Sequence, residues 1–272
     1  MDTVFLIILG FICGMGVNYL SDVFPWKRKL AHPICVTCYQ EAYQQAEEAG
    51  NAAEFAFQGG KFPWLNYLLW PRRCPDRGHR RIWRVWIVEV IYILVTLWLG
   101  GNSPEELGFW ASLFWLVYLG VVVVIDLEYR QIFNLLSLVG TVAGLITGII
   151  LHGFPSTLLG GVAGFAIMFA LFWLAGVFIK IVGRIRGQAV EEVALGFGDV
   201  TLSGVLGLFL GFPGILGGLM LAVFLGGAVS LIYLLVMLGL RRYRMFTALP
   251  YGPSLVMGAI IWYFFRGIIF GI

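Results

Sequence analysis

Two aspartates stand at the ends of strongly apolar runs, and they are the residues of this chain best suited to chemistry. Asp126 follows an unbroken β-branched run at 121–125, and Asp199 opens the apolar run 199–211. An ionisable group in or beside an apolar helix is costly, so each is a functional candidate. Taken singly, each also has a structural explanation: Asp126 ends a helix at the membrane interface, and Asp199 caps one. Taken as a pair at one depth, they predict a carboxylate dyad.

The chemistry of such a dyad follows from its charge. Two carboxylates around one water molecule cannot both ionise easily, so one keeps its proton while the other acts as a base. The base takes a proton from the water, which attacks a peptide carbonyl, and the protonated member donates to the developing oxyanion. The pair therefore predicts an aspartic peptidase. An ion-coupled transporter, with the aspartates as proton or cation sites, is the alternative from another class.

The elements that must position this pair are membrane helices. Hydrophobic residues make up 60% of the 272 residues and charged residues 12%, which is typical of a chain that uses lipid as its solvent. Runs suited to a hydrocarbon core about 30 Å thick predict an all-α, polytopic transmembrane bundle of about eight helices. The predicted runs are 3–20, 84–99, 109–125, 133–151, 157–182, 199–211, 214–240 and 251–270. Only a turn at 211–214 separates the sixth run from the seventh, so one broken helix is an alternative there.

The basic residues predict the orientation. With the N-terminus outside, every Lys and Arg except Arg266 falls on the cytoplasmic side. We therefore expect a multi-pass protein of a bacterial or archaeal inner (cytoplasmic) membrane, with both aspartates facing the cytoplasm. The net charge of +3 is small, and the basic residues gather near helix ends, so nucleic acid is not expected as a partner while membrane lipid is.

The domain organisation has three parts. Residues 1–20 form the first transmembrane helix, residues 21–83 a small cytoplasmic loop domain, and residues 84–272 the transmembrane bundle. Three of the four cysteines, Cys35, Cys38 and Cys74, lie in the loop domain, where a cytosolic location favours a metal site over a disulfide. The segment 40–60 is rich in Ala, Glu and Gln and predicts a helix. The loop is too small for a large core, so a metal or the membrane surface would help to order it.

The sequence around the two aspartates resembles the type IV prepilin peptidases, which are GxGD-type intramembrane aspartic proteases. Gly196, Gly198 and Asp199 match the GxGD motif. The segment 126–134 is similar to the partner motif, an Asp followed by Ile-Pro-Asn, with Phe133 where the family has Pro. The substitution leaves the local turn open but keeps the carboxylate.

Further similarities occur in the same order along the chain. Asn18 in the first helix, Arg84 and Glu89 at the start of the second, and the turn 249–253 into the last helix all resemble the family. Glu89 also has a structural explanation, a side chain that reaches back to water. The resemblance implies that Asp126 and Asp199 are catalytic. The residues it implies as support for substrate or motif are Gly196, Gly198, Asn134, Pro250, Gly252 and Pro253.

The resemblance also implies a metal site and a second activity. Family members often carry two CxxC pairs that can bind zinc; here Cys35 and Cys38 keep the first pair, but Arg77 stands where the last thiol would be. His79 can complete a site with three cysteines and one histidine, and a metal-free loop with three free thiols is the alternative. Bifunctional members methylate the new amino terminus from S-adenosylmethionine, and Asn18, Arg84 and Glu89 are the residues associated with that activity.

The implied substrates are prepilins or pseudopilins with a short basic leader, a Gly before the cleaved bond and an apolar helix after it. A basic leader would stay at the cytoplasmic face while the apolar helix lies in the bilayer, which presents the bond at the depth of the two aspartates. Two departures from the family, Phe133 and the missing fourth cysteine, keep a further alternative open. It is a catalytically silent assembly factor that binds pilin helices without cleaving them.

Overall fold

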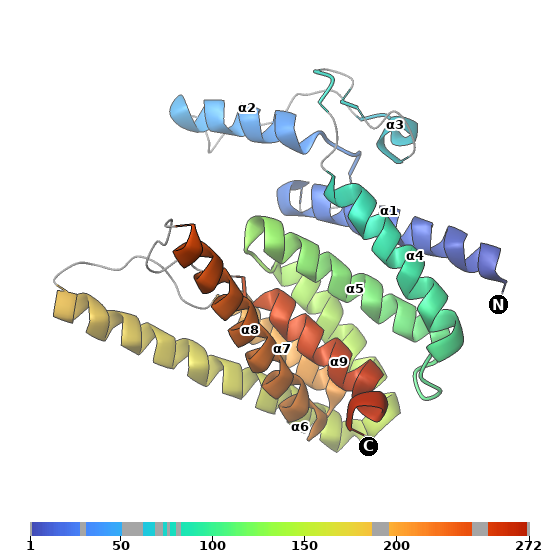
Figure 1. The fold of residues 1–272 in the computed structure, drawn as a ribbon, viewed down its shortest axis with the longest axis vertical. Helices are drawn as coiled ribbons and strands as arrows, with labels where there is room; N and C mark the ends of the chain where they lie inside the picture. Colours follow the sequence, from blue (N-terminus) through green and yellow to red (C-terminus); the bar gives the residue numbers. More distant parts are fainter. Residues whose placement is uncertain are drawn as a thin grey trace. The chain divides into compact units, whose positions relative to one another are not determined.

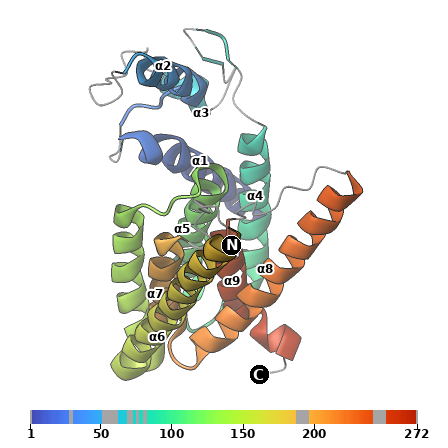
Figure 2. The same cartoon turned by 90° about the vertical axis from the view of Figure 1, so that its left-hand side faces the viewer.

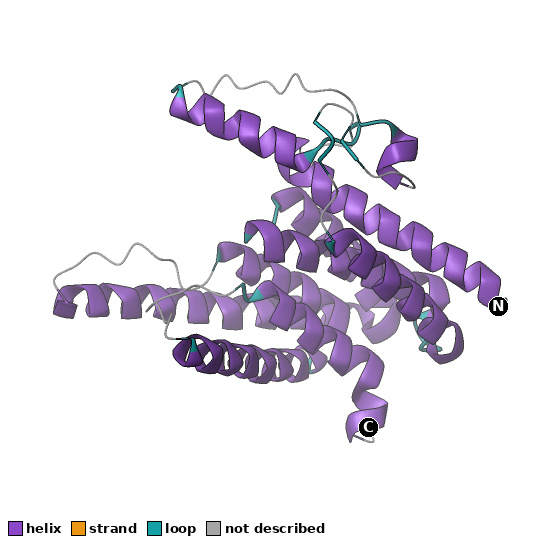
Figure 3. Cartoon of the chain, turned by 45° about the horizontal axis from the view of Figure 1, so that its top comes forward, coloured by secondary structure: helices purple, strands orange, loops and turns teal. Residues whose placement is uncertain are grey.

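The structure is a computed structural model that describes residues 2–27, 31–50, 62–68, 73–74, 77–79, 83–186, 196–240 and 250–270. Within these ranges the chain forms nine helices and no strand, which confirms the predicted all-α class (Figure 3). The chain divides into two compact units, one of residues 1–103 and 108–121 and the other of residues 104–107 and 122–272. The helix α5 (Gly108–Tyr129) therefore contributes to both units.

The first unit is built around two crossing helices, α1 (Thr3–Lys27) and α4 (Arg84–Asn102), which lie side by side (Figure 1). Glycines make the close approach possible, because a Cβ on Gly14 would lie only 2.7 Å from the Cα of Glu89. Besides the first part of α5, this unit also contains α2 (Val36–Glu48) and the short α3 (Trp64–Leu68).

The first helix is longer than predicted. It continues through Pro25 to Lys27 instead of ending at residue 20, so the predicted start of the loop domain at residue 21 is helical. The reason is that Asp22 is neutralised inside the fold, where the Arg84 guanidinium pairs with it and the Tyr67 hydroxyl donates a 2.6 Å hydrogen bond to Oδ2. In the loop, α2 begins earlier than the predicted helix 40–60, and residues 51–61 lie outside the described residues.

The second unit contains the end of α5 and four further helices. These are α6 (Asn134–Arg186), α7 (Phe197–Leu210), α8 (Gly214–Gly239) and α9 (Gly252–Phe270). The short helix α7 contacts α6, α8 and α9, so it is the central element of this unit (Figure 2). Residues 211–213 separate α7 from α8. The sixth and seventh predicted runs are therefore two separate helices and not one broken helix.

The helix α6 is interrupted between the fourth and fifth predicted runs. Gly153 has φ 77° and ψ 162°, a conformation that favours glycine, and Pro155 follows it. The two halves turn back on each other, because a Cβ on Gly148 would lie 2.7 Å from Cγ2 of Thr157. The two predicted runs are therefore separate segments.

Glycines also bring α6 and α7 into direct backbone contact. A Cβ on Gly160 would lie 2.4 Å from the carbonyl oxygen of Gly207, and a Cβ on Gly207 would lie 2.2 Å from that of Gly160. Gly164 makes the same kind of approach to the Ser203 carbonyl oxygen, at 2.4 Å. Close contact of this kind is how small residues stabilise helix pairs in lipid.

Several helices are suited to cross a membrane. Among the described residues, five are long and apolar enough: α1, α4, α5, α6 and α8, while α7 is apolar but shorter. The 53 residues of α6 would measure about 80 Å as one straight helix, far more than a bilayer core needs, and the break at Gly153 divides them into two lengths. Each of the eight predicted runs corresponds to one helix or to one half of α6, although α1 continues to Lys27 instead of residue 20 and α5 to Tyr129 instead of residue 125.

Candidate active site and metal centre

The two aspartates line one cavity. It has a volume of about 280 Å³ and receives Asp126 from the end of α5 and Asp199 from the start of α7. Both side chains are largely buried, with Asp126 5% and Asp199 8% exposed, and the Asp126 carboxylate acts electrostatically on Asp199. The other residues that line the cavity are Arg130, Gln131, Ile132, Gly196, Phe197 and Gly198.

Asp126 is held by the end of its helix and by the start of α9. Arg130 caps α5 in the left-handed conformation, with φ 52° and ψ 37°, and its N–H donates to the Asp126 carbonyl oxygen at 2.9 Å. Gly252 lies directly against the carboxyl group, since a Cβ there would be 2.5 Å from Oδ2. Oδ2 is buried against the start of α9, where the Gly252 backbone N–H acts on the carboxyl group.

Asp199 lies in the first turn of α7. The Gly196 N–H donates to its Oδ2 at 3.3 Å, and the Asp199 N–H donates to the Gly196 carbonyl oxygen at 3.1 Å. An acidic residue at this position is favoured by the partial positive charge of a helix N-terminus. The N-cap residue is Gly196, so the expectation that Asp199 itself caps the helix is wrong; its carboxyl group instead accepts the Gly196 N–H from the first turn, and it also lines the cavity.

The two sequence motifs meet at Gly198. A Cβ on Gly198 would lie 2.9 Å from Cβ and 3.3 Å from Cγ1 of Ile132, which follows Asp126 in the partner motif. A Cβ on Gly196 would instead find its nearest neighbour at 3.6 Å, an ordinary contact. Of the two glycines in the motif, only Gly198 is needed for the close approach between the start of α7 and Ile132.

The other predicted support residues are not among those that line the cavity. Asn134 is exposed and begins α6, and the carbonyl oxygen of the preceding Phe133 accepts the Ser137 N–H at 3.1 Å, so Phe in place of Pro still allows the helix to start. Pro250 precedes α9, and Pro253 is in its first turn, where no helical hydrogen bond is lost.

Sequence reasoning did not single out Arg130, Phe197 or Tyr251. The first two line the cavity, and Tyr251 interacts electrostatically with Asp199. Arg130 carried one usable signal, a basic residue one helical turn after a buried aspartate. Nothing in the spacing of Tyr251 indicated this interaction, because Tyr251 and Asp199 are far apart in the sequence.

The three residues associated with methylation lie where α1 crosses α4. Asn18 is fully buried and its Nδ2 donates to the Val85 carbonyl oxygen at 3.1 Å, while Arg84 pairs with Asp22. Glu89 is only 4% exposed, so the explanation of a side chain that reaches back to water is wrong. A cavity of about 40 Å³ next to Asp22 and Arg84 is far smaller than typical small-molecule pockets. The binding of S-adenosylmethionine stays a prediction for this chain, and no methyl-transfer step follows from these contacts.

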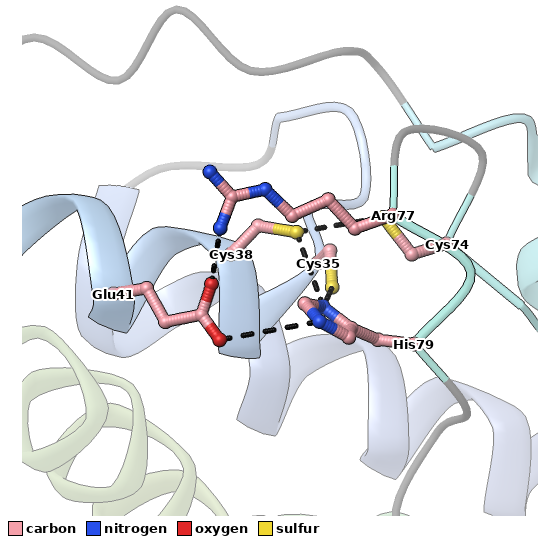
Figure 4. A network of polar contacts seen from close by, with 6 residues as sticks. All are labelled: Cys35, Cys38, Glu41, Cys74, Arg77 and His79. Carbon is pink, nitrogen blue, oxygen red and sulfur yellow. Dashed lines mark hydrogen bonds and ion pairs between the residues drawn. The ribbon is translucent and has the colours of Figure 1, made fainter.

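A second cluster brings together Cys35, Cys38, Cys74 and His79 (Figure 4). Their candidate ligand atoms all lie within 4.8 Å of one another. The Cys38 and Cys74 sulfurs are 3.5 Å apart, and His79 Nδ1 lies 3.4 Å from the Cys38 sulfur and 3.9 Å from the Cys35 sulfur. Tetrahedral zinc at normal bond lengths requires about 3.8 Å between two sulfurs and about 3.5 Å between sulfur and nitrogen. The four side chains therefore fit a zinc ion.

Two thiols of this cluster hold their protons more firmly than a free cysteine does. Burial raises the pKa of Cys35, and burial together with the neighbouring thiols of Cys35 and Cys74 raises the pKa of Cys38 to about 12. A metal ion would bind the thiolates, so its binding would release protons. The surrounding core is small and consists of Cys38, Phe62, Tyr67 and Cys74.

Comparison with known proteins gives the family resemblance independent support. The model of the type IV leader peptidase family matches residues 110–231, a range that contains both aspartates. The resemblance to the type IV leader peptidase family is confirmed. The match covers the cavity residues of α5 and α7 but neither the cysteine cluster nor Gly252.

Two curated relatives are similar in sequence to this chain. A prepilin leader peptidase/N-methyltransferase of Pseudomonas putida is 29% identical over 208 residues, which are 74% of this chain and 66% of that protein. A protein of the same description from Pectobacterium carotovorum subsp. carotovorum is 29% identical over 176 residues, 64% of this chain and 58% of that protein. The matches thus span less than two thirds of each relative. No solved structure matches the chain significantly.

Proposed function

We propose that this chain is an intramembrane aspartic endopeptidase that removes the short basic leader from type IV prepilin-like proteins. The observation that carries the proposal is the single cavity lined by two buried carboxyl groups, Asp126 and Asp199, from two apolar helices. Both residues fall within the part of the chain that matches the leader peptidase family. The names of the two relatives supply the substrate class, prepilins, as an expectation for this chain.

The chemistry proceeds through the shared proton of the pair. Two carboxyl groups that interact across one cavity retain one proton between them, which leaves one base and one acid. The base takes a proton from a water molecule as its oxygen bonds to the scissile carbonyl carbon, and the acid donates to the carbonyl oxygen. In the collapse of the tetrahedral intermediate the C–N bond breaks: the carboxyl group that took the water's proton passes it to the leaving amine, and a hydroxyl of the intermediate returns its proton to the other carboxylate as the product carboxyl group forms. The dyad then returns to its starting charge.

The proposal includes the site's location. The distribution of Lys and Arg supports an inner-membrane protein whose cavity faces the cytoplasm, where a basic leader would remain. The alternatives are an ion-coupled transporter and a silent pilin-assembly factor. Neither is favoured by a specific feature of the cavity, whereas the pairing of carboxyl groups favours hydrolysis.

We also propose that the cysteine cluster binds zinc, held by Cys35, Cys38, Cys74 and His79. When bound, the ion would cross-link α2 to the segment 74–79 and so stabilise a loop that has only a small core. Amino-terminal methylation stays a prediction, supported by the relatives' names.

The test is leader cleavage in membranes that contain the full chain. A prepilin-like substrate is incubated with the parent, Asp126→Asn, Asp199→Asn and the matched charge-neutralising control Glu105→Gln, an exposed carboxylate outside the cavity. We expect cleavage by the parent and the control, and none by either dyad variant. Absence of cleavage by the parent across several prepilins would refute the peptidase proposal and favour the silent factor. Loss of ion-coupled uptake in both dyad variants, without any cleavage, would favour the transporter.

A further inference from the structure

Two charged side chains lie next to the cluster of three cysteines and one histidine. Glu41 lies on α2 and Arg77 lies in the turn that follows Cys74 (Figure 4). Arg77 donates a hydrogen bond to Glu41 Oε2, and Oε1 of the same carboxylate lies 3.9 Å from His79 Nε2. The three side chains thus form a row that runs from Arg77 through Glu41 to the imidazole.

Local structure fixes both ends of this row. Glu41 follows Cys38 by three residues on α2, so the thiol and the carboxylate share one helix face. On the other side, the Cys74 N–H donates to the His79 carbonyl oxygen at 2.8 Å, and the Gly78 N–H donates to the Cys74 carbonyl oxygen at 2.9 Å. Gly78 has φ 69°, which favours glycine and closes the turn tightly. This turn presents His79 to the thiols and Arg77 to Glu41.

The two nitrogens of His79 have different neighbours. Nδ1 faces the sulfurs of Cys35 and Cys38, whereas Nε2 faces the Glu41 carboxylate. A neutral imidazole that binds metal through Nδ1 must carry its proton on Nε2, and that N–H needs an acceptor. A separation of 3.9 Å is longer than a direct hydrogen bond, but a small side-chain rotation or one bridging water spans it.

Charge balance gives Arg77 a role as well. Three thiolates, a neutral imidazole and a divalent zinc ion carry a net charge of about −1. The Glu41 carboxylate next to this centre would be repelled by it, and the Arg77 guanidinium offsets that repulsion. Arginine is suited to the task because it stays charged and holds a carboxylate firmly.

We propose that Glu41 and Arg77 are positioning residues of the metal centre. Glu41 accepts the Nε2 proton of His79 and so directs Nδ1 to the metal, and Arg77 holds Glu41 in place. This inference rests on the proposed zinc site and goes beyond it, because it assigns outer residues that determine how tightly the metal binds. It also explains how a histidine serves as the fourth ligand.

A simpler explanation is a solvent-exposed ion pair with no bearing on the metal. The Arg77 and Glu41 side chains are 56% and 39% exposed, and ion pairs of this kind contribute little to stability. Thermal stability therefore cannot distinguish the two explanations. Metal affinity can, because loss of an outer partner of a metal-bound histidine typically weakens binding about 10- to 100-fold.

The experiment measures zinc affinity of the purified full-length chain in detergent by competition with a chromophoric chelator. The variants are Glu41→Gln, Glu41→Ala and Arg77→Gln, and the control is Glu47→Gln, an exposed carboxylate further along the same helix. We expect Glu41→Ala to weaken zinc binding by about tenfold or more, and Glu41→Gln, which keeps an oxygen acceptor, to weaken it less. Arg77→Gln should have a smaller effect than Glu41→Ala, and the control none.

A double-mutant cycle separates positioning from general damage. In a His79→Ala background the residual zinc affinity should not change when Glu41→Ala is added, because the imidazole that Glu41 orients is gone. If the parent binds zinc and Cys38→Ser does not, but Glu41→Ala binds it as tightly as the parent, the positioning roles are wrong and the zinc site stands. If the parent itself binds no zinc, both the site and the positioning roles are refuted.

Discussion

The contact between Gly198 and Ile132 allows a sharp test of how the two motifs are held together. Gly198→Ala adds one methyl group at a point where the new Cβ would lie 2.9 Å from the Ile132 Cβ. Carbon atoms in ordinary contact are about 3.5–4.0 Å apart, so the start of α7 or the segment before α6 must shift by about 0.6 Å or more. Asp199 is the next residue, so the shift moves a proposed catalytic carboxyl group.

Two opposing effects set the expected stability change. Overpacking of this size typically costs about 1–3 kcal/mol, whereas replacing glycine by alanine inside a helix returns about 1 kcal/mol. The net destabilisation should be between about 0 and about 2 kcal/mol, so the variant should still fold. Activity should suffer more, because misplacing a catalytic group by about 1 Å can cost about a hundredfold in rate. We expect a loss of about 10- to 100-fold in leader cleavage.

The matched control is Gly196→Ala. The added Cβ would have its nearest neighbour at 3.6 Å, and the backbone angles, φ −79° and ψ 145°, suit alanine. The hydrogen bond from the backbone N–H of residue 196 to Asp199 Oδ2 is kept. Cleavage rates of both variants are compared at equal amounts of folded protein, judged by thermal unfolding in detergent. Adding Ile132→Gly to Gly198→Ala should restore part of the lost activity, because it removes the atom that the methyl group meets. An equal loss in both alanine variants, or no loss in either, would refute the steric reasoning.

Three further predictions address other parts of the chain. Tyr67→Phe removes the hydrogen bond to the buried Asp22 carboxylate and should lower the free energy of unfolding by about 1.5–3 kcal/mol, measured by denaturant or heat in detergent; an unchanged value would contradict the buried pairing. Cys38→Ser should abolish stoichiometric zinc, measured by elemental analysis. Burial raises the pKa of Cys38 to about 12, so zinc binding by the parent protein must displace protons. The apparent zinc affinity should therefore fall by about tenfold or more for each pH unit by which the pH is lowered. A pH-independent zinc affinity would argue against thiolate ligands. Arg130→Gly should raise the free energy of unfolding by about 0.5–1 kcal/mol, because glycine adopts φ 52° without strain. Tyr129→Gly, within the helix, should lower the free energy of unfolding.

Much of the fold follows from local patterns. Apolar runs give helices in lipid because every backbone polar group must be paired within its own segment, and this rule located the helices to within a few residues. The rule failed at the end of α1, because the charge of Asp22 predicts that the apolar helix ends before this residue. Its partners Arg84 and Tyr67 come from distant parts of the chain, so local reasoning had no means of pairing them.

In the candidate site, too, some residues could be identified from the local sequence and others could not. Asp126 and Asp199 could be singled out because a carboxylate beside an apolar helix is costly wherever it occurs. The approach of Gly252 to Asp126 could not be derived, since it depends on how α9 packs against the end of α5. The position of His79 among the thiols depends in the same way on the turn at Gly78, and the role of Glu41 requires knowing which ring nitrogen faces it.

The glycine contacts between α6 and α7 limit how the site can move. With the backbones of Gly160 and Gly207 touching, neither helix can slide or rotate past the other without a collision of main-chain atoms. Asp199 is therefore mounted on a rigid two-helix block. We therefore expect any movement that admits a substrate to occur on the other side of the cavity, where Asp126 lies at the end of α5 and against the start of α9. A covalent tether between α6 and α7 should leave turnover intact, which makes this pair the natural anchor point for reporters of movement in the rest of the site.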